Sequence, residues 1–179
     1  RGLGVEGVAL GQQGAGRLQD ARHQEAQAPL GQSLERLAQA QEALGTSDPR
    51  LLESIGANRR AVASNLLLAR LGMDLARSQQ AVAEFQAQNF DGAETAFQEV
   101  RAAVEGIGRE AAGQGLPAVA QEATQRLEEL DRNIEACRVG RDSHQVEELV
   151  RQANGRWEEA EQAVGQRDLL KASDVLADG

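Results

Sequence analysis

Apolar residues recur at alternating steps of three and four through three consecutive segments of this 179-residue chain. Side chains at those offsets lie above one another on one face of an α-helix, so the spacing predicts three long amphipathic helices. The three apolar sets are Ala93, Phe97, Val100, Val104 and Ile107; then Leu116, Ala120, Ala123, Leu127, Leu130, Ile134 and Cys137; then Val146, Val150, Ala153, Trp157, Ala160 and Val164.

Short interruptions separate these three segments. Gly113-Gln114-Gly115 precedes the second segment, and Gly140-Arg141-Asp142-Ser143 precedes the third. Short loops between long amphipathic helices favour antiparallel packing of neighbours. Residues typical of strands are sparse and form no alternating run. The sequence therefore predicts an all-α fold, an antiparallel bundle in which the apolar faces meet. Trp157 is expected to pack in the core, with a groove-lining role as the alternative if its helix lies at an edge.

A helix-start signal lies upstream, at Ser47-Asp48-Pro49. Asp48 can cap the first free amides of a helix, and Pro49 suits the first helical position, where no donor is needed. The helical pattern persists from there to about Gln88, with a break allowed near Gly56, and the next turn is expected at residues 89–92. Near the end of the chain, a short helix is expected over about residues 168–176.

Glycines crowd the first 28 residues, where we expect a weak helical hairpin. Each glycine costs a helix interior about 1 kcal/mol relative to alanine. Gly4, Gly7, Gly11 and Gly14 nevertheless follow three-four spacing and could form a smooth stripe that another helix approaches closely. Pro29 is expected to separate this hairpin from a short helix that ends near Gly45. We therefore divide the chain into a Gly-rich helical hairpin region, 1–46, and an antiparallel helical bundle, 47–179.

Composition excludes several classes of function. A net charge of −9 without a basic cluster argues against a nucleic-acid partner, because binders neutralise phosphates with grouped Lys and Arg. The single cysteine excludes an intrachain disulfide, and its place on an apolar stripe favours packing over reactivity.

No window is apolar enough for a transmembrane segment, and no signal peptide opens the chain. The compartment is unknown, with the cytoplasm as the default; the initial Arg suggests a fragment of a larger protein.

Sequence motifs for nucleotide binding, metal binding or catalysis are weak. Residues 2–7 spell G-x-G-x-x-G, but a dinucleotide site needs a preceding strand and a βαβ unit, so we read this match as coincidence. Neither His23 nor His144 has a Glu three residues before it, as a di-metal bundle would require. His144, Glu147 and Glu148 are better explained as a solvated face. The sequence predicts no catalytic residue, no metal site and no cofactor, and the protein is not expected to be an enzyme.

The segment from Gly140 to Val150 resembles the phosphopantetheine attachment turn of acyl carrier proteins, in which a Ser after Asp opens an acidic helix. The resemblance implies that Ser143 would carry the prosthetic arm. His144 departs from the family, which has Leu there, and a long helix precedes the turn where the family has an extended loop. An ordinary helix cap, with Asp142 at its start and Gln145 three residues later, explains the same residues.

Three short segments resemble tetratricopeptide repeats, in which paired helices stack into a curved array. The matching residues are Val5, Val8, Ala9, Gly16-Arg17-Leu18, Ala21 and Ala28; then Asn89-Phe90, Ala93 and Phe97; then Gln166-Arg167-Asp168-Leu169, Ala172 and Leu176. The matches cover about a third of the chain, no constant period links them, and the helices expected between residues 91 and 165 are longer than the repeat's. The resemblance implies stacked helical hairpins that contact other proteins.

Together these observations favour a non-catalytic helical scaffold or protein–protein interaction module. It would contact another protein, or itself, through a helix face, and the three-four alternation also suits a coiled coil. The alternative is a carrier or small-ligand-binding protein that uses Ser143 or a pocket between helices.

Overall fold

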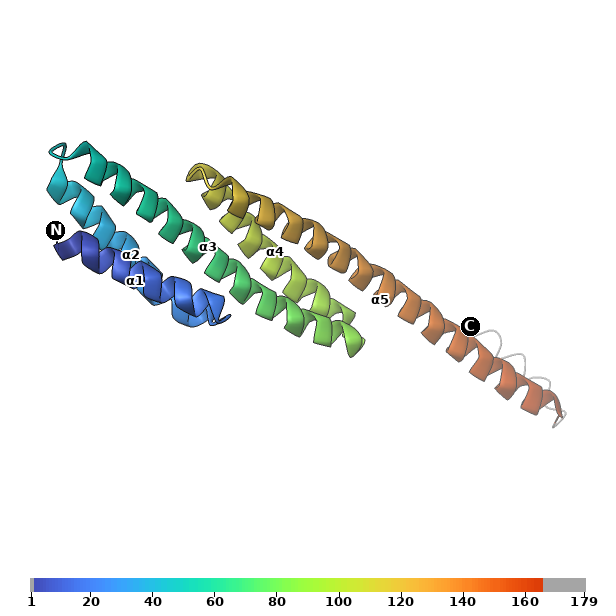
Figure 1. The fold of residues 1–179 in the computed structure, drawn as a ribbon. Coiled ribbons are helices and arrows are strands. Elements are labelled where there is room, and N and C mark those ends of the chain that lie inside the picture. Colours follow the sequence, from blue (N-terminus) through green and yellow to red (C-terminus); the bar gives the residue numbers. More distant parts are fainter. Residues whose placement is uncertain (1, 166–179) are drawn as a thin grey trace. The chain divides into compact units, whose positions relative to one another are not determined.

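The protein is all-α. A computed structural model describes residues 2–165, and these form five helices: α1 (Gly2–Gln19), α2 (His23–Leu44), α3 (Pro49–Gln86), α4 (Phe90–Gly113) and α5 (Pro117–Gly165) (Figure 1). No strand occurs among these residues, which confirms the predicted fold class. Contacts divide the chain into two compact units, Arg1–Ile134 and Glu135–Gly179.

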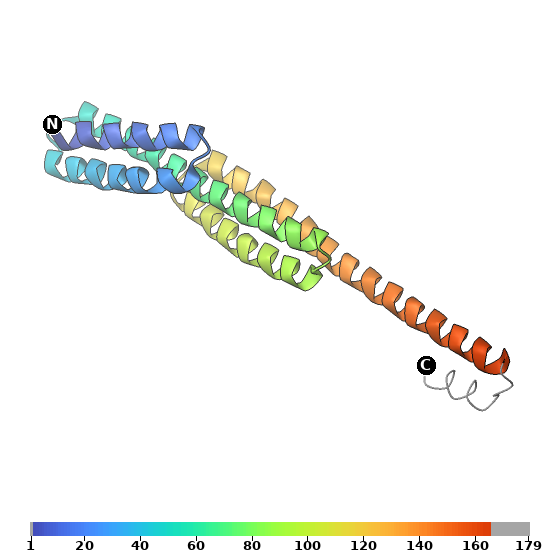
Figure 2. The same cartoon turned by 90° about the horizontal axis from the view of Figure 1, so that it is seen from below.

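In the first unit, α3 takes part in two helical packings (Figure 2). Its first half packs against the antiparallel hairpin of α1 and α2. Its second half packs against α4, which in turn packs against the beginning of α5. The buried residues of the first packing are Ala26, Leu30, Leu37, Ile55, Val62 and Ala69. Those around α4 include Leu71, Ala81, Phe97, Val100, Val104, Ile107, Leu116, Val119, Ala123 and Leu130. The apolar stripes predicted for residues 93–107 and 116–134 are therefore confirmed as core faces.

The predicted glycine stripe is the face by which α1 approaches its neighbours. Gly7, Gly11 and Gly14 are buried. A Cβ atom at Gly14 would lie 2.5 Å from Cγ of Leu30, and one at Gly7 would lie 2.9 Å from Cγ of Leu37. Only a residue without a side chain fits at such distances, so the glycines set the close spacing of α1 and α2.

Pro29 does not separate two helices as predicted; it lies inside α2 and is buried. Proline has no N–H, so in a helix it leaves the carbonyl four residues earlier without its usual donor. That carbonyl belongs to Glu25, and Nη1 of Arg17 in α1 donates a hydrogen bond to it at 2.8 Å. A donor from the neighbouring helix thus replaces the missing one, which lets α2 continue through the proline.

The start of α3 confirms the predicted cap. Asp48 accepts a hydrogen bond from the backbone N–H of Leu51 at 3.1 Å, and Pro49 is the first helical residue. The break allowed near Gly56 is wrong, because α3 continues unbroken to Gln86. Ile55, beside that glycine, is buried in the core, and its burial outweighs the helix cost of about 1 kcal/mol for Gly56.

Both short turns of the second packing lie close to where they were predicted. Asn89 caps α4, accepting a hydrogen bond from the backbone N–H of Gly92 at 3.2 Å, so the turn precedes Phe90 rather than including it. The turn after Gly113 contains Gly115 with φ +67°, and α5 begins at Pro117. Gly115, in the left-handed region, ends α4, and Pro117, two residues later, suits the first position of α5.

The loop predicted at residues 140–143 does not exist, because α5 continues through it to Gly165. Gly140 weakens a helix by about 1 kcal/mol, but no proline follows it to force an end. The third predicted stripe is a core face only at Ala160, which is buried; Val146, Val150 and Trp157 are exposed. The short helix predicted over 168–176 lies outside the described residues.

A candidate binding groove between three helices

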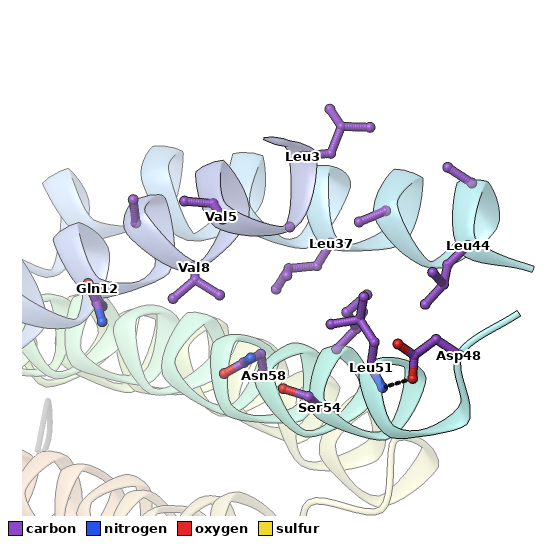
Figure 3. A pocket seen from close by; sticks show the side chains of 15 residues that line it. Leu3, Val5, Val8, Gln12, Leu37, Leu44, Asp48, Leu51, Ser54 and Asn58 are labelled. Carbon is purple, nitrogen blue, oxygen red and sulfur yellow. Dashed lines mark hydrogen bonds between the residues drawn. The ribbon is translucent and has the colours of Figure 1, made fainter. Parts of the chain in front are cut away.

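An apolar groove of about 740 Å³ lies between the beginning of α1, the end of α2 and the beginning of α3, within the first unit (Figure 3). Its apolar lining consists of Leu3, Gly4, Val5, Val8, Ala9, Leu37, Ala40, Ala43, Leu44, Leu51 and Ile55. Val5 is 71% exposed and Leu51 40% exposed, so the walls present apolar surface to solvent. The volume and the apolar lining are typical of a binding site.

The packing of α1 explains why the groove opens where it does. At Gly11, α1 approaches α3 so closely that a Cβ atom would lie 2.9 Å from Cγ2 of Val62. Gly7 is held to α2 by Ser33, whose buried Oγ donates a hydrogen bond to the Gly7 carbonyl at 2.6 Å. The remaining space between α1 and α3 lies on the N-terminal side of the Gly11 contact, where Val8 faces the helix that carries Asn58 (Figure 3).

The polar groups of the groove do not form a catalytic arrangement. Among the described lining residues, the polar side chains are those of Gln12, Asp48, Ser54 and Asn58. The only carboxylate of this set, that of Asp48, is already engaged as the cap of α3. General acid–base chemistry needs a titratable group that is free to reach a substrate. The groove is therefore suited to apolar contact.

A smaller cavity of about 180 Å³ lies in the second packing of the first unit, between α3, α4 and α5. Asp74, in its lining, is 6% exposed and was not singled out by the sequence. Burial raises the pKa of the Asp74 carboxyl, although the nearby guanidinium groups of Arg77 and Arg70 act in the opposite direction. Nη1 of Arg77 lies 3.6 Å from Oδ1 of Asp74. The one signal in the sequence for this buried carboxyl is that Asp74 interrupts a run of apolar residues.

The weaker motifs fall within helices. The glycines of G-x-G-x-x-G form the first turns of α1, and a helix does not provide the strand-to-helix loop that holds a pyrophosphate. His23 is the first residue of α2, and its ring packs against Gly72 of α3. His144 lies on α5 and is exposed. Among residues 2–165, no three His, Cys, Asp or Glu side chains form a group that could hold a metal ion.

Ser143, the residue singled out by the acyl-carrier resemblance, is exposed but lies within the uninterrupted helix α5. The turn that the resemblance requires before this serine is absent, so its local geometry differs from the one expected. Cys137 is buried, as predicted from its place on an apolar stripe. Trp157 was predicted to pack in a core and is instead 59% exposed.

In the part of the chain that the structure describes, every helix is too short or too polar to span a lipid bilayer. The resemblance to tetratricopeptide repeats stays a prediction, because searches against protein families, characterised proteins and solved structures find no match to this chain.

Proposed function

We propose that the protein is a non-catalytic interaction module whose groove between α1, α2 and α3 binds an amphipathic helix of a partner protein. The observation that carries the proposal is the exposed apolar lining of that groove, above all Val5 and Leu51. Contiguous exposed apolar surface is a marker of interaction sites. A single partner helix would cover it.

The shape of the groove favours a helix as the occupant. All of its walls are helices, α1, α2 and α3, and a further helix between α1 and α3 would complete a four-helix packing at the usual axial separation of about 8–10 Å. Helix-in-groove recognition uses apolar anchors at helical spacing, which the row of Leu and Val side chains can accept. The occupant would therefore present a stripe of Leu or Val residues.

The charge of the chain favours basic residues on the rest of the partner helix. The net charge is −9, and Glu42 and Glu53 adjoin the lining residues Ala43 and Ser54 in sequence. Complementary charge at the rim of an apolar site speeds association and selects partners. Lys or Arg beside the apolar stripe would satisfy this requirement.

A model peptide tests the proposal directly. We would measure binding of a fluorescent 18-residue Leu/Lys amphipathic helix by anisotropy, with a scrambled peptide of the same composition as control. Val5→Glu should weaken binding at least tenfold, because it places a charge on an apolar wall without disturbing a buried residue. Gln13→Glu adds the same charge to α1 outside the groove and should leave binding unchanged. Equal binding of the scrambled peptide, or of the Val5→Glu variant, would contradict the proposal.

A small apolar ligand is the second candidate occupant. The groove volume of about 740 Å³ lies within the range of small-molecule sites, roughly 300–1,000 Å³. 1-Dodecanol serves as the probe, and calorimetry measures its binding. Stoichiometric binding of this alcohol that Val8→Glu abolishes, together with failure of the helical peptide to bind, would replace the first proposal with the second.

A further inference from the structure

A row of exposed apolar side chains follows α5 within the second unit. Val146 is 59% exposed, Val150 53% and Trp157 59%. With Ala153 they alternate at steps of four, three and four, which is the spacing of the contact positions of a coiled coil. We call these four residues the α5 stripe. Leu149, 64% exposed, flanks it.

The polar atom of the stripe already has a partner on its own helix. Nε1 of Trp157 donates a hydrogen bond to Oε1 of Glu161 at 3.0 Å. A buried indole needs such a partner, so Trp157 can be covered by an apolar surface without losing a hydrogen bond. Further along, Ala160 and Ala163 are buried already, so the free surface is centred on residues 146–157.

We propose that the α5 stripe binds the same stripe of a second copy of this chain, with the two helices antiparallel. In the heptad notation, Val150 and Trp157 occupy a positions, and Val146 and Ala153 occupy d positions. Antiparallel pairing about a centre between Arg151 and Gln152 places every a residue opposite a d residue. This surface is separate from the groove, and the proposal does not depend on the groove's function.

The sizes of the side chains select this orientation. In the antiparallel register, Trp157 lies opposite Val146 of the second copy, and Val150 lies opposite Ala153. Each large side chain then meets a smaller one, as close packing of facing layers requires. A parallel dimer would instead oppose Trp157 with Trp157 and Ala153 with Ala153, which places an overfilled layer next to an underfilled one.

The charges that flank the stripe select the same orientation. A parallel coiled coil pairs each g residue with the following e residue of its partner, which would bring Asp142 against Glu147. The antiparallel register places Glu147 opposite Asn154 and Leu149 opposite Arg156. No acidic side chain between residues 146 and 157 then faces another across the interface, whereas the parallel arrangement costs a like-charge contact.

Sedimentation equilibrium of the full chain tests the association. We expect reversible, concentration-dependent dimers, because an interface of four facing layers is small. Val150→Glu should raise the dissociation constant at least tenfold by placing a carboxylate in an apolar layer. Gln145→Glu adds the same charge about 140° around the helix from Val150, so it should leave the dissociation constant unchanged. A wild-type monomer at all concentrations, or equal weakening by both variants, would overturn the proposal.

A single cysteine tests the orientation. In the Cys137→Ala background, Ser143→Cys places one thiol per chain at an exposed a position. In the antiparallel register the two thiols lie about 26 Å apart along the axis, beyond the reach of a disulfide, so oxidation should yield no covalent dimer. Spin labels on the same cysteine should report that long separation. A disulfide-linked dimer under mild oxidation would show a parallel arrangement and overturn the proposal.

Discussion

Single residues without side chains determine how the N-terminal hairpin packs. Gly7, Gly11 and Gly14 lie where a Cβ atom would be within 3 Å of a neighbouring side chain. Such contacts stabilise the hairpin through the close approach of its helices rather than through large apolar side chains. This suits a chain in which aromatic residues make up only 2%. The stripe was predictable from spacing alone, because glycines three and four apart share a helix face.

Gly14→Ala should destabilise the protein by about 1–3 kcal/mol, because the new methyl group would overlap Leu30 and lie 3.3 Å from the carbonyl oxygen of Ala26. Gly16→Ala is the matched control in the same helix. It has nothing within 4 Å and should stabilise by about 0.5–1 kcal/mol through helix propensity. Urea unfolding measures both. Equal effects of the two substitutions would show that α1 is not packed through its glycines.

Asp74 predicts a pH dependence of stability. Burial raises its folded-state pKa above the unfolded value, so the folded protein binds the extra proton and the stability contributed by this group falls as pH rises through the raised pKa. Asp74→Asn removes that cost. The difference in stability between Asp74→Asn and the wild type should be near zero at about pH 3, below the unfolded pKa of an aspartate, and should grow in favour of the variant toward about pH 8. Urea unfolding at both values checks this, and a gain that does not grow with pH would refute the role assigned to burial.

At the scale of elements, local signals predicted the starts of helices better than their ends. Asp48 and Pro49 predicted the start of α3, because a cap and a fixed φ act within one turn. Pro29 and Gly140 misled for different reasons. A helix continues through Pro29 because Arg17 of another helix supplies the missing donor, which sequence spacing cannot reveal. Gly140 destabilises a helix only slightly, so α5 continues through it.

Ser143→Pro distinguishes the continuous helix from the loop that the sequence suggested. In a loop followed by a helix start, proline at this position would be tolerated. Inside α5 it should cost about 3 kcal/mol, because it removes a hydrogen bond and clashes with the preceding turn. Hydrogen exchange of the amides around residues 139–147 should accelerate. Unchanged exchange and unchanged circular dichroism would mean that α5 is interrupted there.

At the scale of the molecule, periodicity identified the apolar faces but not what covers them. The stripes of residues 93–107 and 116–134 lie in a core, whereas Val146, Val150 and Trp157 of an equally regular stripe are exposed. Nothing in the spacing distinguishes these cases, because burial depends on which helices lie nearby. The groove was not predictable either, since it results from the close contact of Gly11 with Val62 and the space left beside it.

We expect apolar faces left open on the described helices to be covered by another chain. Trp157 is the only tryptophan, so intrinsic fluorescence reports on the α5 stripe alone. The emission should be that of a water-exposed indole in dilute solution and should shift to shorter wavelength, with reduced acrylamide quenching, as protein concentration rises. Val150→Glu should move this transition to higher concentration. Emission that remains water-exposed at every concentration would contradict the account.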